Sequence, residues 1–158
     1  MNYQEALGTV NNNGMDLERL TAEFQDDQKI VFAAINAIAA SSMFAREDLP
    51  CPLQFASDRL RDNFEAVSYA LKNCGGLALM HASERLRDNG ETVQIALALN
   101  PIALQYASTR LRAHKPTVVF AVSQRGSGKN GKFALIHASQ DLQQDSEIIQ
   151  AANLNSSD

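Results

Sequence analysis

One eleven-residue motif occurs three times in the middle of the chain, and this repetition constrains the fold more than any other feature. Each copy has leucine at positions −3 and +4 relative to a central alanine, serine at +1, and arginine at +3 and +5. The central alanines are Ala56, Ala82 and Ala107, so the copies are 26 and 25 residues apart. A repeat of this period is typical of stacked helical units.

The spacing inside each unit predicts two short amphipathic helices joined by a turn. Positions −3, 0 and +4 share one face of a helix, and a second apolar stripe follows at +11 and +14. Asn63 and Asn89 stand where a second helix needs its N-cap, whereas Gly75 and Pro101 are typical of a helix stop and a new start. Helices this short are marginal alone in water, so we predict that stacked units bury one another's apolar faces as a small α-solenoid.

Two degenerate copies of the motif flank the three regular ones. They have Gln25 and Gln143 at +5 and lack the paired arginines. Terminal units of a solenoid are expected to be atypical, because one face meets water instead of a neighbour. We therefore predict a single all-α domain over residues 16–153 with degenerate capping units at both ends. The predicted segments are a flexible arm over 1–15, units near 16–52, 53–76, 77–100, 101–125 and 132–153, and a frayed tail over 154–158.

Composition and charge argue against several classes of protein. The 158 residues suit one domain, and no apolar run approaches the ~18 residues of a membrane helix. The net charge is −4, yet residues 53–125 hold nine basic and six acidic residues. This local excess is too small and too mixed with carboxylates for a nucleic-acid-binding surface. Cys51 and Cys74 lack metal-ligand spacing, and a reduced, cytoplasmic setting is the simplest account of them.

Two segments could carry chemistry, and both are weak candidates. The stretch from Gly126 to Lys132 matches the start of a phosphate-binding loop, but Phe133 replaces the serine or threonine that would hold magnesium. We interpret it as a mobile loop inserted between repeat helices. Cys74 is expected in an exposed turn with His81 nearby, but no third partner orients them. The sequence thus predicts no catalytic, cofactor-binding or metal site, and leaves a cysteine- or nucleotide-dependent accessory domain as the least favoured alternative.

Aromatic and histidine side chains share position −1 of the units. This position accepts phenylalanine, tyrosine and histidine, which predicts a half-buried flat side chain that packs between helices. The residues are Phe55, His81, Tyr106 and His137.

The candidate binding residues are the arginines of the regular units, because stacking turns a shared position into a row across the surface. One interpretation is local ion pairing with nearby acidic residues. The other is a row of planar donors that faces an acidic surface on a protein partner. The six arginines are Arg59, Arg61, Arg85, Arg87, Arg110 and Arg112.

The motif Leu-x-(Phe/Tyr/His)-Ala-Ser-x-x-Leu-Arg, followed by a Val-x-x-Ala helix, resembles an uncharacterised repeat family known only as a domain of unknown function. The likeness covers Leu53–Val122 well and Phe133–Asn153 in part. Members of the family occur as arrays in protists and in proteins of intracellular bacterial pathogens, including candidate secreted effectors. The resemblance implies a bacterial effector or effector-associated regulator that works by binding protein.

The leading functional hypothesis is therefore a protein–protein interaction module that modulates a partner, such as an enzyme or another effector. Binding of nucleic acid or membrane is not expected. The expected location is cytoplasmic, and the effector interpretation implies delivery into a host cell by a non-classical secretion route. The main alternative is a self-associating repeat protein, a homodimer formed through the exposed apolar stripe of an imperfect cap.

Overall fold

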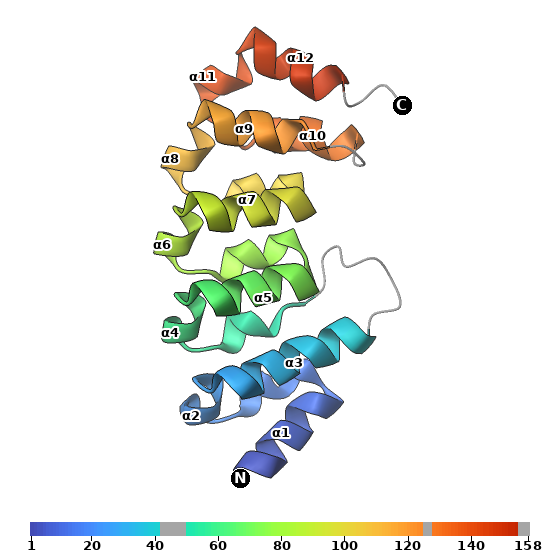
Figure 1. The fold of residues 1–158 in the computed structure, drawn as a ribbon, viewed down its shortest axis with the longest axis vertical. Helices are drawn as coiled ribbons and strands as arrows, with labels where there is room; N and C mark the ends of the chain where they lie inside the picture. The colour runs from blue at the N-terminus through green and yellow to red at the C-terminus, as the bar shows by residue number, and fades with distance from the viewer. Residues whose placement is uncertain (42–49, 125–127, 155–158) are drawn as a thin grey trace.

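The computed structural model describes residues 1–41, 50–124 and 128–154, and all regular secondary structure in these ranges is helical. Five units stack along the long axis, so the first and last helices lie at opposite ends of the molecule (Figure 1). The predicted all-α repeat fold is confirmed.

Each of the first four units contains a 3-10 helix, a short α-helix of one turn and a longer α-helix. In chain order these are η1 (Gly14–Arg19), α2 (Ala22–Gln25) and α3 (Gln28–Ser41); η2 (Pro52–Phe55), α4 (Asp58–Arg61) and α5 (Phe64–Cys74); η3 (Gly76–His81), α6 (Glu84–Arg87) and α7 (Gly90–Leu99); η4 (Pro101–Tyr106), α8 (Thr109–Arg112) and α9 (Lys115–Val122). In the last unit an α-helix replaces the 3-10 helix, giving α10 (Gly128–Leu135), α11 (Gln140–Gln143) and α12 (Ser146–Leu154).

The first helix of the predicted helix-turn-helix unit is thus split in two, and the Ala-Ser pair of the motif causes the break. Ala82 and Ser83 have ψ angles of 156° and 160°, which are extended and cannot continue a helix. The Ser83 hydroxyl instead accepts a hydrogen bond from the Leu86 N–H at 3.2 Å, so the serine is the N-cap of α6. Ser57 and Ser108 cap α4 and α8 in the same way.

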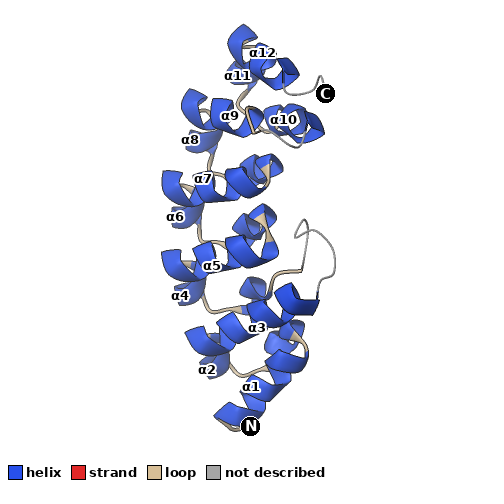
Figure 2. Cartoon of the chain, turned by 45° about the vertical axis from the view of Figure 1, so that its right-hand side comes forward, coloured by secondary structure: helices blue, strands red, loops and turns tan. Residues whose placement is uncertain are grey.

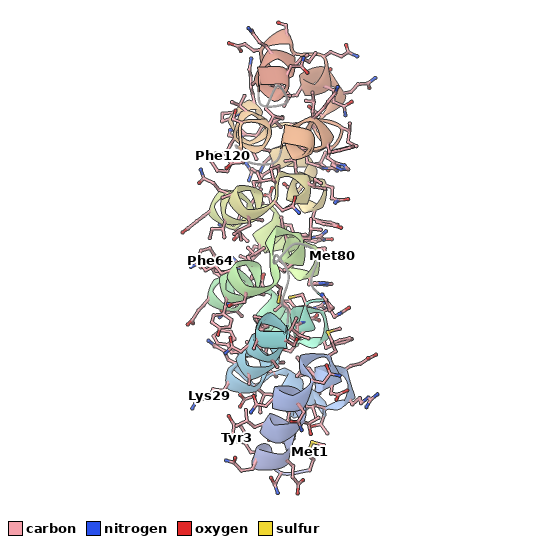
Figure 3. All side chains as sticks on the ribbon, turned by 90° about the vertical axis from the view of Figure 1, so that its right-hand side faces the viewer. Met1, Tyr3, Lys29, Phe64, Met80 and Phe120 are labelled. Carbon is pink, nitrogen blue, oxygen red and sulfur yellow. The ribbon has the colours of Figure 1, made fainter. Side chains whose placement is uncertain are left out.

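The helices form two layers and one edge. The long helices make one layer, the 3-10 helices and α10 make the other, and the short helices stack along one edge (Figures 1 and 2). In the side view, Lys29, Phe64 and Phe120 mark the face of the long helices, whereas Met80 marks the face of the 3-10 helices (Figure 3).

The core lies between the two layers and contains the predicted stripes. The leucines at −3 are fully buried, and those at +4 are at most 3% exposed in the three regular units. In the last unit, Leu142 at +4 is only half-buried, because among the described residues none forms a unit that packs over it. The buried leucines of the regular units are Leu53, Leu60, Leu79, Leu86, Leu104 and Leu111.

The N-terminal segment differs from the predicted flexible arm. Residues Tyr3–Asn12 form helix α1, which packs on α3 and η1 and fully buries Ala6 and Val10. Asn2 and Glu5 form a capping box at its start, the sequence signal that predicts this helix. The helix covers the N-terminal end of the array.

The predicted inserted loop and the predicted tail fall only partly within the described residues. Residues 128–132, predicted to belong to a loop, are the first turns of α10, while residues 125–127 of that loop lie outside the described residues. Helix α12 ends at Leu154, and the rest of the predicted tail, 155–158, is likewise outside them.

Candidate functional site

The arginines at +3 are held by the preceding unit. The Arg85 guanidinium donates from Nε to Oδ1 of Asp62 at 3.0 Å and from Nη2 to the Asp62 carbonyl oxygen at 2.6 Å. The Ser83 hydroxyl donates to the same carboxylate. We call this set of serine and arginine closing on an aspartate of the preceding unit the inter-unit clamp. It recurs as Ser57 and Arg59 on Asp26, and as Ser108 and Arg110 on Asp88.

The clamp engages half of the candidate arginines in ion pairs, which is what one of the two interpretations expects. Hydrogen bonds from the serine and then from the arginine hold the pKa of Asp26, Asp62 and Asp88 below the ordinary range for aspartate. The three arginines are paired with aspartates, as the local-pairing interpretation expected, and each of these aspartates belongs to the preceding unit. Their first role is to connect units.

The interface between the fourth and fifth units lacks the clamp, because both the aspartate and the arginine are replaced. Ala113 replaces the aspartate, and Asp141 replaces the arginine that would reach it. Two ion pairs join the units instead, with Nζ of Lys115 at 2.8 Å from Asp145 and 2.5 Å from Glu147. The joint loss of both partners is the sequence signal that could have identified the pairing across units.

The clamp makes the stability of the folded protein depend on pH. Because the folded-state pKa of each clamp aspartate is depressed, its contribution is present above the unfolded pKa of about 4 and is lost as pH falls through the lower folded value. We expect the urea midpoint to drop as pH is lowered below about 4, and to drop less in an Asp26→Asn/Asp62→Asn/Asp88→Asn variant. Equal pH dependence in the two proteins, measured by circular dichroism, would contradict this role.

The arginines at +5 differ from those at +3 in burial and in hydrogen-bonding. Arg61, Arg87 and Arg112 are half-buried, and their Nε atoms are enclosed without a hydrogen-bond partner. Arg61 donates from Nη2 to Asp58. In the described part of the chain, the side chains of Arg87 and Arg112 make no ion pair or hydrogen bond. These two guanidinium groups are the donors that remain available.

Glutamine occupies the +5 position in the outer units and behaves differently there. Nε2 of Gln25 donates to the Leu17 carbonyl oxygen at 3.2 Å, and Nε2 of Gln143 donates to that of Ala138 at 2.8 Å. Both glutamines therefore satisfy backbone carbonyls of their own unit. The unpaired donors at +5 belong to the regular units.

Each +5 arginine lies near the −1 ring of the following unit. Burial, and then the charge of Arg61, lower the pKa of His81; burial and Arg112 do the same for His137. Arg87 and Tyr106 line one hollow of about 450 Å³, into which Arg112 also opens. The −1 side chains are half-buried, as predicted. We call Arg61, Arg87 and Arg112 with His81, Tyr106 and His137 the arginine–ring row.

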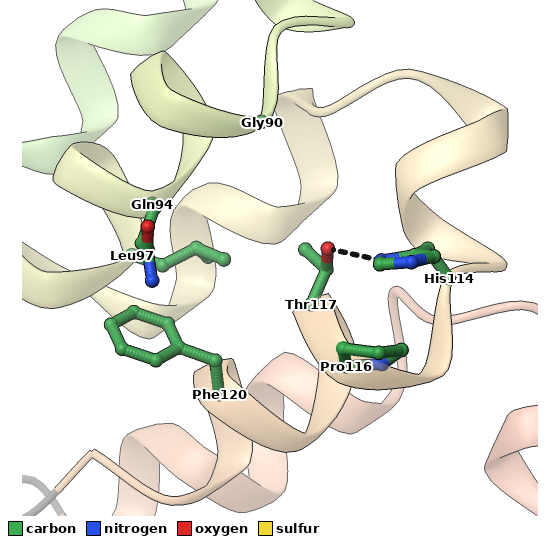
Figure 4. A pocket seen from close by; sticks show the side chains of 7 residues that line it. All are labelled: Gly90, Gln94, Leu97, His114, Pro116, Thr117 and Phe120. Carbon is green, nitrogen blue, oxygen red and sulfur yellow. Dashed lines mark hydrogen bonds between the residues drawn. The ribbon is translucent and has the colours of Figure 1, made fainter.

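A second hollow lies between α7 and α9 (Figure 4). It measures about 250 Å³ and opens where Gly90 has no side chain to fill it. Nδ1 of His114 and the Thr117 hydroxyl face one another across a 2.9 Å hydrogen bond, so these two atoms are already engaged. Its remaining wall is formed largely by Leu97, Pro116 and Phe120.

The two weak candidates for chemistry are placed as follows. Cys74 is buried, not exposed as predicted, because α5 extends through it before Gly75 turns the chain with φ of 99°. It lies against the equally buried Cys51, whose pKa is raised by the hydrogen bond between the thiols and by burial. Gly126 lies outside the described residues, whereas Gly131 packs in α10 against the Val122 carbonyl, which a Cβ atom would approach to 2.7 Å.

The described residues, 1–41, 50–124 and 128–154, also bear on metal binding and on membrane insertion. Within them, no three histidine, cysteine, aspartate or glutamate side chains are grouped so as to hold a metal ion. No helix in the same ranges has the length and apolar content to cross a membrane.

Fold and surface together define an α-solenoid built from short helical units. The model of a domain of unknown function (DUF4116) matches residues 45–87 and again residues 70–112. The two matches start 25 residues apart, which is one unit, and together they run from just before η2 to the end of α8. This part of the chain is therefore similar to an uncharacterised domain family. No curated protein and no solved structure matches the chain.

Proposed function

We propose that this protein is a protein–protein interaction module that binds its partner through the arginine–ring row. The observation that carries the proposal is the pair of unengaged guanidinium groups of Arg87 and Arg112, which open onto one hollow beside Tyr106. Arginine and tyrosine are enriched among the residues that dominate binding energy at interfaces. Held on stacked helices, they lose little conformational freedom on binding.

The different hydrogen-bonding of the +3 and +5 arginines favours the arginine–ring row over the row of +3 arginines as the binding surface. The +3 arginines already have carboxylate partners, so a ligand would have to compete with the inter-unit clamp. The +5 arginines of the third and fourth units have no such competitor, and a carboxylate on a partner would supply the missing acceptors.

The test is capture of a stoichiometric partner, with cross-links mapped by mass spectrometry. We expect cross-links near α6, η4 and α8, and loss of the complex in an Arg87→Gln/Arg112→Gln variant. Glutamine is the residue that this chain itself carries at +5 in Gln25 and Gln143, so the substitution suits the fold. A Lys29→Gln/Lys72→Gln variant removes the same charge from α3 and α5 and should bind as the unmodified protein does. A partner that keeps its affinity for the arginine variant would refute the proposed surface.

A finer proposal concerns the biological role. We propose that the module serves as a bacterial effector or effector-associated regulator whose partner is an enzyme or another effector. The resemblance of its motif to repeats in proteins of intracellular pathogens supports this role. Capture from lysates of the source bacterium and of a eukaryotic cell distinguishes a bacterial partner from a host partner, and a complex that leaves its partner's activity unchanged would argue against regulation.

Self-association is the second candidate, and the last unit favours it. Leu142 is only half-buried there, and Ile136 and Ile149 are 61% and 37% exposed. Two copies could cover these side chains by pairing their last units. Sedimentation equilibrium would show a dimer that Ile149→Glu dissociates, whereas a monomer at all concentrations would exclude this alternative.

A further inference from the structure

We propose that the arginine–ring row binds an acidic peptide segment in the polyproline II conformation, with one carboxylate at every third residue. This inference rests on the proposed function and specifies the chemistry of the partner at the same site. It follows from three features: the charge of the row, the hollow between the third and fourth units, and the spacing of the units.

The charge of the row calls for carboxylates. Arg87 and Arg112 line the hollow of about 450 Å³ together with two acidic side chains, Glu84 and Asp88. Asp88 is already hydrogen-bonded to Ser108 and Arg110. Among the described residues that line the hollow, Glu84 is then the one carboxylate left to balance the two positive charges of Arg87 and Arg112. A guanidinium binds a carboxylate through two parallel N–H donors, and this geometry is stronger than a contact between neutral groups.

The hollow has room for peptide side chains and surfaces suited to them. Gln105 and Thr109 supply polar contacts beside Tyr106, whose ring gives a flat surface. Polyproline segments dock against aromatic side chains of this kind in other recognition domains, because the preformed helix loses little entropy on binding.

The row extends beyond this hollow in both directions. On one side, burial and then the charge of Arg61 lower the pKa of His81. On the other side, burial and then the charge of Arg112 lower the pKa of His137. Three arginines therefore follow one another at the same position of successive units, each beside a ring of the next unit. Arg61 is already paired with Asp58, so the step from Arg87 to Arg112 is the one at which both guanidinium groups are available to a ligand.

The spacing selects the conformation of the ligand. Packed helices lie about 8–10 Å apart, so neighbouring units present an arginine at roughly that interval. A polyproline II helix rises about 3.1 Å per residue with three residues per turn, so every third side chain points the same way about 9 Å further on. A β-strand covers a similar distance in three residues but turns alternate side chains away. An α-helix needs about six residues for the same distance.

The experiment uses the full chain and labelled peptides in fluorescence anisotropy. A peptide of repeated Glu-Ala-Pro should bind at least about tenfold more tightly than a peptide of the same composition with its glutamates consecutive. It should also lose about tenfold or more in affinity for Arg87→Gln/Arg112→Gln, and little for Lys29→Gln/Lys72→Gln. Circular dichroism and urea unfolding confirm that each variant is folded.

Three results would overturn the inference. Equal binding of the spaced and the consecutive peptides would show general attraction of acid without a spacing requirement. Tighter binding of a peptide with glutamates every sixth or seventh residue would favour a helical ligand. Binding of a single-stranded oligonucleotide of equal charge at least as tightly would favour a nucleic acid.

The inference and the proposed function fail in different ways. If no peptide binds but the captured partner is still lost in the arginine variant, the surface is correct and the ligand chemistry is wrong. If the captured partner binds the arginine variant normally, the proposed surface itself is wrong.

Discussion

Replacement of Gly76 by alanine is expected to destabilise the protein by about 3 kcal/mol, since overpacking against a backbone that cannot move is costly. Gly76 begins η3, and a Cβ atom there would lie 2.4 Å from the carbonyl oxygen of Ala96 and 2.9 Å from the Asn100 nitrogen. These atoms lie in the last turn of α7 and at its C-cap residue in the same unit, so relief of the clash would separate the two layers. Urea unfolding followed by circular dichroism measures the effect.

Gly90 provides the matched control. It lies at the first position of α7, and no atom lies within 4 Å of a Cβ placed there. Gly90→Ala should raise stability by roughly 0.5 kcal/mol, because alanine restricts the unfolded chain without a clash in the folded one. A similar change in stability for the two variants would show that the close approach of η3 to α7 is unimportant.

Replacement of Leu86 by alanine is expected to cost about 3–4 kcal/mol, the range for a fully buried leucine whose cavity does not collapse. Leu86 is 1% exposed in a core shared by neighbouring units. The loss should appear as a lower urea midpoint. Hydrogen exchange should show its largest increase in α6 and α7, because contacts in a solenoid are local.

Leu142 occupies the same +4 position in the last unit and is half-buried. Leu142→Ala should cost roughly 1 kcal/mol, since less apolar surface returns to water. If both leucine variants lost the same stability, a neighbouring unit would not be the source of the burial at +4.

The repeat made the fold largely predictable, because the same apolar residues at the same positions of successive units favour the same packing. The apolar frame located the buried leucines, and Asn63 and Asn89 are the N-caps of α5 and α7 as predicted. The split of the first helix was missed. Leu, Ala and Leu at −3, 0 and +4 also suit one continuous helix, and only the capping role of the serine at +1 distinguishes the two structures.

The sequence predicted which arginines form the candidate surface, but it did not predict which of them are available for binding. Shared arginine positions identified the two rows, but the sequence alone did not separate their roles. The partner of Arg85 is Asp62, 23 residues earlier, and a pairing at that distance depends on how units stack. The availability of Arg87 and Arg112 is also a matter of orientation, because acidic residues such as Glu84 are close in the sequence yet make no ion pair with them.

The inter-unit clamp has a consequence for how arrays of this kind can grow. Each clamp joins only adjacent units, and the third unit carries both halves: Ser83 and Arg85 reach back, while Asp88 receives the next unit. An in-frame duplication of residues 76–100 would therefore bring matching halves to both junctions of the added copy. The length of the array can change by whole units without any new interface having to evolve, and each added copy would lengthen the proposed binding surface by one arginine.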